Sequence, residues 1–125
     1  ELWDAHLPKT PSKTFIRQTK EELLARNLQL ATVAVNNHEF TSQDSQRRAA
    51  DVTMVKRWID VVADFGCSVL RVLPGELKAL NTYPSERYPL VRAAFEECLG
   101  SAQARHVTLA IENCPGRLDL TLSSS

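Results

Sequence analysis

The chain has 125 residues, enough for one ordinary domain with a buried core. Its fifteen basic and fifteen acidic residues cancel, so the composition provides no basic surface for nucleic acid or for an anionic membrane. No apolar run approaches the roughly 20 residues that a membrane-spanning helix needs. Cys67, Cys98 and Cys114 are widely spaced and form no C-x-x-C pair, which favours a reducing compartment, so we expect a cytoplasmic protein.

Strands and helices are predicted to alternate along the chain. The strands are short apolar runs rich in Val, Leu and Ile, and the helices show apolar residues at a spacing of three and four. In order, the elements are a strand at 2–3, a helix over 12–26, a strand over 28–35, a helix from a cap at Ser42 or Asp44 to Gly66, a strand over 67–73, a helix from about Ser85, and a strand over 107–111.

Each predicted helix has an apolar stripe that we expect to be buried. The stripes are Phe15, Ile16, Leu23 and Leu24 in the first helix, Val52, Val55, Trp58, Ile59, Val62 and Ala63 in the second, and Val91, Ala94, Phe95, Cys98 and Ala102 in the third. Strand–helix alternation predicts an α/β fold of parallel βαβ units with right-handed crossovers.

Periodicity alone leaves a doubly wound sheet and part of a barrel open as alternatives. The sequence has neither G-x-G-x-x-G after a strand nor G-x-x-x-x-G-K-[ST], so a nucleotide-binding doubly wound fold lacks its usual motif. The chain starts on Glu1-Leu2-Trp3 without an initiator Met, and its last residues close no recognisable element. We therefore expect residues 1–125 to be a single partial domain that is truncated at both ends.

Polar residues follow the predicted strands at their carboxyl ends, where parallel α/β folds place their chemistry. They are Asp4 and His6, Asn36 to Phe40, Arg71, and Glu112 with Asn113. His106 precedes a strand at the opposite end, so we expect a structural or solvent-exposed role for it. Arg71, within an apolar strand, needs an acceptor, and both an ion pair with a neighbouring strand and a substrate contact remain open.

Glu112 ends the most apolar strand. Its alternation partners are Thr108 and Ala110, both small, while Val107, Leu109 and Ile111 are expected to face the helices. A carboxylate that points into the mouth of a barrel is costly unless it is paired or holds a cation. Glu112 is therefore predicted to be a metal ligand or an acid/base group.

These residues resemble a known family. Residues 109–113 (LAIEN) are similar to the fifth-strand motif of xylose-isomerase-like TIM barrels, and residues 69–75 (VLRVLPG) to the end of their fourth strand. Residues 47–66 resemble the preceding helix, residues 36–40 (NNHEF) the third-strand loop, and residues 1–3 the end of the second strand. The resemblance is to the sugar-phosphate isomerase/epimerase family, and it implies an incomplete TIM barrel that covers about strands two to five.

The resemblance also implies an activity. The family holds one divalent metal (Mn, Mg, Co or Zn) with Glu, Asp, His and Glu side chains, and its glutamates move protons on a sugar. Only the first glutamate has a counterpart here, Glu112, and the other ligands would lie beyond Ser125. The resemblance makes His38, Arg71, His6 and Asn113 candidate contacts to a small-molecule sugar or sugar phosphate, and this piece alone is expected to be inactive.

Two alternatives remain open. The same superfamily includes apurinic-site endonucleases, metal phosphodiesterases whose third-strand histidine could match His38. Leu73 stands where their fourth-strand histidine would be, and the net charge of zero of the chain argues against binding to DNA phosphates. The second alternative is a non-catalytic barrel that only binds sugars or partners. No nucleic-acid or membrane partner is expected, and self-association of the chain is left open.

Overall fold

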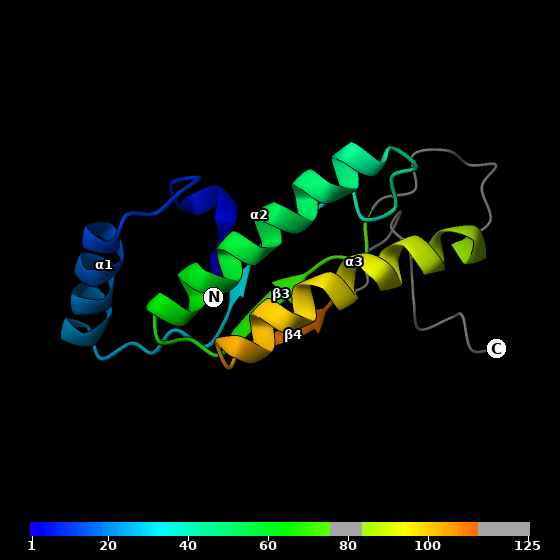
Figure 1. Ribbon diagram of the computed structural model, residues 1–125. Helices are drawn as coiled ribbons and strands as arrows, with labels where there is room; N and C mark the ends of the chain where they lie inside the picture. The colour runs from blue at the N-terminus through cyan, green and yellow to red at the C-terminus, as the bar shows by residue number, and fades with distance from the viewer. Residues whose placement is uncertain (76–83, 113–125) are drawn as a thin grey trace.

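The computed structural model describes residues 1–75 and 84–112. In these residues short strands alternate with helices, which confirms the α/β prediction (Figure 1). The elements are β1 (Leu2–Trp3), the 3-10 turn η1 (Asp4–His6), α1 (Lys13–Ala25), β2 (Val33–Ala34), α2 (Ser45–Asp64), β3 (Val69–Val72), α3 (Pro84–Ala104) and β4 (Thr108–Ile111). Within the described residues, no helix is long and apolar enough to cross a membrane.

The four strands form one parallel sheet in the order β1-β2-β3-β4. Each strand therefore pairs with the one that precedes it in the chain. A doubly wound sheet reverses its strand order at a switch point, whereas a barrel adds strands in sequence. The observed order settles the alternative that periodicity left open, in favour of part of a barrel.

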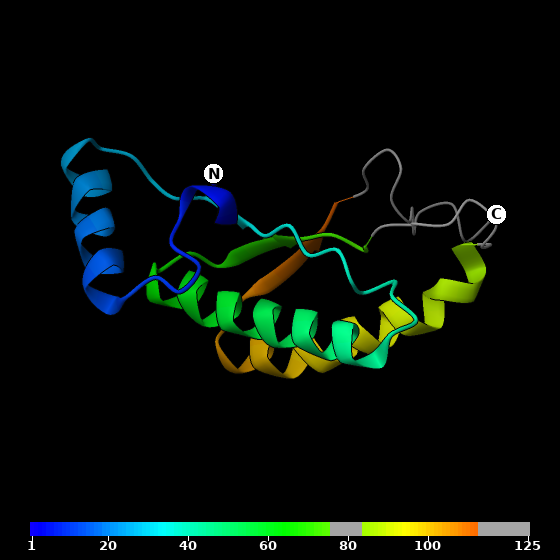
Figure 2. The same cartoon turned by 90° about the horizontal axis from the view of Figure 1, so that it is seen from above.

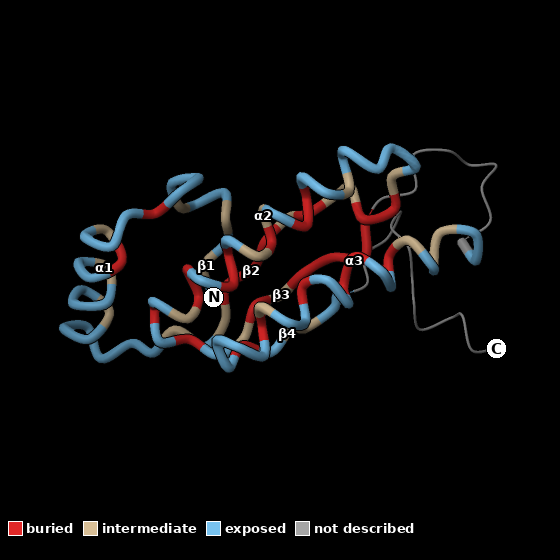
Figure 3. Tube along the Cα trace, viewed as in Figure 1, coloured by how far each residue is buried: buried red, intermediate tan, exposed pale blue. Residues whose placement is uncertain are grey.

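The core lies between this sheet and two helices. Figure 2 shows α2 and α3 together on one face of the sheet, and Figure 3 shows the buried residues along β2, β3 and the facing sides of both helices. Val33, Leu70 and Val72 point into this layer and are fully buried. Among the described helices, none covers the opposite, concave face.

The long helices follow the predicted patterns. The side chain of Asp44 caps α2 by accepting hydrogen bonds from the backbone N–H groups of Gln46 (2.9 Å) and Arg47 (3.4 Å). In α2 the predicted stripe is buried except for Ala63, which is half-buried, and the stripe of α3 is buried throughout. Cys67 and Cys98 are buried free thiols, and burial raises the pKa of the Cys98 thiol to about 11.

The first helix is less buried than predicted. Ile16 is buried, but Leu24 is 80% exposed, so its assignment to the buried side was wrong. The physical reason is the position of α1, which lies apart from α2 and α3 beside the end of α2 (Figure 1). No second layer of the described chain reaches Leu24.

One strand prediction also needs correction. The run at 28–35 forms a strand only at Val33–Ala34, which pairs with two residues of β1 on one side and two of β3 on the other. Ile111 pairs with the buried Val72 and so lies on the helix face, as predicted, although it is 48% exposed at the end of the last described strand. Val107 is buried and Leu109 packs against the core, as predicted.

The three described α-helices end in the same turn. The second residue after each helix has a positive φ: Asn27 (54°), Gly66 (75°) and His106 (55°). In each case that residue donates to a carbonyl three residues back, and the next residue donates to a carbonyl five residues back, at 2.8–3.2 Å. This is the Schellman motif, which satisfies the last carbonyls of a helix. His106 is exposed in this turn, consistent with a structural role.

Candidate functional site

The register of the sheet places four residues side by side. Trp3 pairs with Ala34, Ala34 with Arg71, and Arg71 with Ala110. Side chains paired across parallel strands point to the same face. Since Leu70 and Val72 point into the helix layer, this row lies on the concave face. The strands thus present a tryptophan and an arginine, separated by one alanine, to the concave side.

Arg71 is fixed by two neighbours. Its guanidinium lies over the Trp3 ring, 5.5 Å from the centroid, and its Nη1 forms an ion pair with Glu112 Oε2. The Arg71 side chain is only 13% exposed, and Glu112 supplies the acceptor that a buried arginine was predicted to need. Its Nε is buried and has no hydrogen-bond partner among the described residues. Because the Ala34 side chain between them is small, Arg71 can reach across β2 to the Trp3 ring.

Glu112 directly follows β4, and its backbone N–H donates to the carbonyl of Val72 (3.1 Å). Its side chain is 47% exposed and lies on the same face as Arg71 and Ala110, as the ion pair requires. A half-exposed carboxylate at the carboxyl end of a parallel strand can accept a proton from a molecule bound there. Its role as metal ligand or acid/base stays a prediction.

The end of β1 contributes His6 and Asp4. The His6 ring lies nearly parallel to Trp3, with the ring centroids 6.1 Å apart, so His6 borders the Trp3–Arg71 cluster. The Asp4 carboxylate accepts hydrogen bonds from the backbone N–H (3.1 Å) and side-chain amide (3.2 Å) of Asn36. Asp4 therefore ties the end of β1 to the end of β2.

The loop after β2, which carries His38, is held in place by contacts with α2. Asp51 Oδ2 accepts a hydrogen bond from the backbone N–H of Glu39 (3.0 Å), and the carboxylate lies close enough to His38 for their charges to interact. Burial raises the pKa of Asp51 above its usual value, although the backbone hydrogen bonds and His38 act against this shift. Phe40 anchors the loop in the core, edge-on to Phe95 at 5.1 Å.

The same loop is joined to the end of β3. The fully buried Asn37 side chain donates to the Leu73 carbonyl (2.6 Å) and accepts from the Leu73 N–H (2.8 Å), so it substitutes for a strand neighbour. A Cβ on Gly75 would lie 2.9 Å from the Thr41 backbone nitrogen, so these loops touch. Leu73, at the position where the nuclease resemblance expects histidine, is fully buried.

The described residues do not make up a metal site. No group of three His, Cys, Asp or Glu residues in the described ranges could hold a metal ion. Glu112 is one carboxylate, and it already contacts a cation, Arg71. A divalent cation of this kind needs several oxygen or nitrogen ligands.

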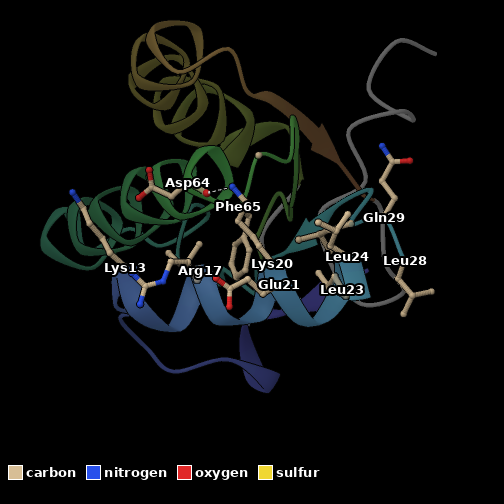
Figure 4. A pocket seen from close by; sticks show the side chains of 13 residues that line it. Lys13, Arg17, Lys20, Glu21, Leu23, Leu24, Leu28, Gln29, Asp64 and Phe65 are labelled. Carbon is tan, nitrogen blue, oxygen red and sulfur yellow. Dashed lines mark hydrogen bonds between the residues drawn. The ribbon is translucent and has the colours of Figure 1, made fainter. Parts of the chain in front are cut away.

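A cavity of about 650 Å³ lies elsewhere, between α1 and the end of α2. Figure 4 shows its lining, with Lys20 reaching the backbone carbonyl of Asp64 (3.4 Å). Phe65 and Gly66 also line the cavity. It therefore lies beside the turn between α2 and β3, at the amino end of the sheet. It contains none of the predicted site residues, and we keep the concave face as the candidate site.

The structure thus joins some of the predicted residues. Arg71 and Glu112 form an ion pair, and His6 borders them through Trp3, while His38 lies on the loop that Asp51 holds. Asn113 lies outside the described residues. Sequence reasoning missed Trp3 and Asp51. Asp51 stands one turn before Val55 in the apolar stripe of α2, and a carboxylate in such a stripe is the signal that could have revealed it.

Solved structures share this arrangement. A D-tagatose 3-epimerase-like protein is 18% identical with a TM-score of 0.68, and the match covers 83% of this chain and 40% of that protein. The 3-keto-D-glucoside 4-epimerase YcjR from E. coli is 12% identical with a TM-score of 0.71, covering 90% and 46%. A xylose isomerase domain protein from Planctomyces limnophilus is 14% identical with a TM-score of 0.65, covering 85% and 41%.

The matched region is therefore less than half the length of these proteins, and identities this low show the fold alone. A comparison with curated proteins finds no match. The sequence model described as "Xylose isomerase-like TIM barrel" matches residues 1–123, almost the whole chain. With the sequential parallel sheet and the polar carboxyl end, this match leads to one conclusion: the chain belongs to the xylose isomerase-like TIM barrel family.

Proposed function

We propose that this chain is part of a longer barrel protein, and that the complete protein isomerises or epimerises a sugar by moving a proton next to a carbonyl group. Two comparisons with other proteins support this reaction class. The family match covers residues 1–123, and similar folds occur in a tagatose epimerase-like protein and a keto-glucoside epimerase. Within the chain, the proposal is carried by Glu112, the half-exposed carboxylate on the concave face.

Glu112 is the proposed proton acceptor. In the reaction its carboxylate takes the proton from the carbon next to the substrate carbonyl, and the electron pair of the C–H bond forms the double bond of an enediolate. Return of a proton to the other face of that carbon gives an epimer. Return of the proton to the former carbonyl carbon, with transfer of the hydroxyl proton from the oxygen of the first carbon to the former carbonyl oxygen, exchanges aldose and ketose. Arg71 holds the carboxylate in place through the ion pair, so the base is oriented before the substrate arrives.

The divalent cation that the resemblance implies stays a proposal for the complete protein. Such a cation would polarise the substrate oxygens and stabilise the enediolate. The described residues supply one carboxylate toward it, which is too few, so no step is assigned to the metal here.

The test is solvent-deuterium exchange into a ketose substrate by the complete protein and its Glu112→Gln variant. Removal of a general base is expected to slow exchange by about 10²–10⁴-fold. The matched control is Glu96→Gln, which removes an exposed carboxylate paired to Arg92 at 2.8 Å on α3 and should leave exchange unchanged. Exchange at the parental rate in Glu112→Gln would exclude Glu112 from proton transfer.

A double-mutant cycle separates this role from a structural one. If Glu112 serves only to neutralise Arg71, then Glu112→Gln and Arg71→Met should destabilise the protein comparably, with strong coupling in the double variant. In that case the folded fraction of Arg71→Met/Glu112→Gln should exchange deuterium normally. If Glu112 is the base, exchange stays lost in the double variant whatever its melting temperature.

A further inference from the structure

One face of α1 carries both positive charge and apolar surface. Four of its residues, at spacings of four, three and four, lie in one row along the helix: Lys13, Arg17, Lys20 and Leu24. All four line the cavity between α1 and the end of α2, and Figure 4 shows them in this order along it. The row therefore has a cationic end and an apolar end, and at 1.5 Å per residue it is roughly 16 Å long.

The apolar end is a continuous surface and not a single side chain. Leu24 is 80% exposed and Leu28 is 57% exposed, and Figure 4 shows the half-buried Leu23 beside them. Leu30 and the aromatic side chain of Phe65 also line the cavity. A lone exposed leucine is ordinary, but several apolar side chains grouped at one cavity mark a binding site.

The cationic end keeps a net positive charge. Two carboxylates, those of Glu21 and Asp64, line the cavity together with three cations. The Asp64 carboxylate accepts a hydrogen bond from Arg105 at 2.8 Å, so its charge is already balanced. Lys20 donates to the backbone carbonyl of Asp64 (3.4 Å), which leaves the charge of the ammonium group in place. The first turn of α1 has no acidic residue, and the helix dipole adds positive potential there.

A ligand that matches both ends has a negative head and an apolar tail. The cavity volume of about 650 Å³ lies within the roughly 300–1,000 Å³ that is typical of small-molecule sites. The described lining comes from residues 13–30 and 64–66, so the site is built by two neighbouring helices of this chain and the segments that follow them.

We propose that this cavity binds a medium-chain fatty acid, with its carboxylate at Lys13 and Arg17 and its acyl chain along the leucines. The bound acid contacts both α1 and the end of α2, and it covers apolar surface that α1 otherwise exposes to water. The proposal does not rest on the proposed function, because the cavity lies at the amino end of the sheet and Glu112 lies at the carboxyl end.

The first experiment measures binding of sodium decanoate to the complete protein by calorimetry. We expect one site per chain, with at least tenfold weaker binding of butyrate, which has the carboxylate on a short chain, and of 1-decanol, which has the long chain without the charge. Added salt should weaken the binding of decanoate and not that of decanol, because the head pairs with exposed cations. Equal affinity for decanoate and decanol would contradict the proposal.

Substitutions at the two ends locate the site. We expect Arg17→Gln to weaken decanoate binding at least threefold, and Leu24→Gln at least fivefold. The matched controls are Arg92→Gln and Leu99→Gln, which change exposed residues of α3 away from the cavity lining and should leave binding unchanged. Because all four side chains are exposed, the variants should fold like the parent, which thermal unfolding checks. Binding that is unchanged in Arg17→Gln and Leu24→Gln would overturn the proposal.

The same variants distinguish two other occupants of the cavity. If a second copy of the protein fills it, the parent is a dimer on a sizing column and Leu24→Gln is a monomer. If another segment of the complete protein fills it, Leu24→Gln lowers the melting temperature and decanoate does not bind to the parent. Either result would reject the fatty-acid site.

Discussion

The two ends of the parallel sheet are built in different ways. At the amino end, one backbone solution occurs three times: Asn27, Gly66 and His106 each take a positive φ and close the same pair of hydrogen bonds. At the carboxyl end, each junction uses a different side-chain contact, such as Asp4 with Asn36 or Asn37 with Leu73. Where the backbone alone makes the turn, residue identity matters little. Where side chains make the junction, each residue is specific to its place.

The largest expected effect at the carboxyl end is that of Asn37→Ala. It leaves the buried N–H and carbonyl of Leu73 unpaired, which should cost about 3 kcal/mol in the free energy of unfolding, measured in urea on the complete protein. Asn36→Ala is the control, since Asn36 is half-buried and its side-chain amide bonds only to Asp4 among the contacts described. An equal loss in the free energy of unfolding for the two variants would show that the hydrogen bonds between Asn37 and Leu73 stabilise the protein no more than the contact of Asn36 with Asp4.

A pair of glycines compares the two ends directly. Gly75 has a φ of 112°, and its new Cβ would meet the backbone and side chain of Thr41 at 2.8–2.9 Å, so Gly75→Ala should destabilise by about 2–3 kcal/mol. Gly66 has a φ of 75°, and the nearest atom is Lys20 Nζ at 3.8 Å, so Gly66→Ala should cost about 1 kcal/mol. Thermal unfolding of both variants checks the order, and the reverse order would contradict the difference drawn between the two ends.

The third prediction concerns pH. Because burial raises the pKa of Asp51 above 3.8, its carboxyl favours folding most when protonated, and stability falls as pH rises from the unfolded pKa through the folded one. Asp51→Asn keeps an acceptor for the Glu39 N–H but cannot ionise. The stability of this variant relative to the parent should therefore increase with pH across that window, as urea unfolding at several pH values would show. A difference in stability between Asp51→Asn and the parent that does not change with pH would contradict this prediction.

The smallest effects are expected at the amino end. His106→Gly should stabilise the protein by about 0.5–1 kcal/mol, because a side chain other than glycine is strained at a φ of 55°. Asn27→Gly should gain only a few tenths of a kcal/mol, about half as much or less, since Asn tolerates this conformation better than His. Differential scanning calorimetry can resolve both shifts. A loss of stability in His106→Gly would mean that its imidazole contributes more than the turn.

The sequence predicted much of the fold because its signals are local. The cap at Asp44, the stop at Gly66 and the buried stripes of α2 and α3 depend on residues within one or two turns of each other. Leu24 was wrongly assigned to the buried side, because the stripe of a helix shows which side is apolar and not whether another layer covers it.

The candidate site was predictable only in part. The sequence placed Arg71 and Glu112 at strand ends and left an ion pair open as one of two roles for Arg71. It could not place Trp3 beside Arg71, since that contact depends on the register of β1 with β2 and of β2 with β3. The alternation of apolar residues predicts which face of the sheet a side chain lies on, but not which residues of two strands joined by a long helical crossover lie opposite each other.

The strand order has a consequence for how the chain acquires its structure. Each described strand after β1 pairs with the one that precedes it, so a partner has already been synthesised when that strand emerges. On the ribosome, β2 can dock on β1, and β3 on β2, as each βα unit leaves the exit tunnel, and the loops that close are only as long as one crossover. At each stage the most recently added strand has one edge with unpaired backbone groups, and the strand of the next βα unit to emerge pairs with that edge.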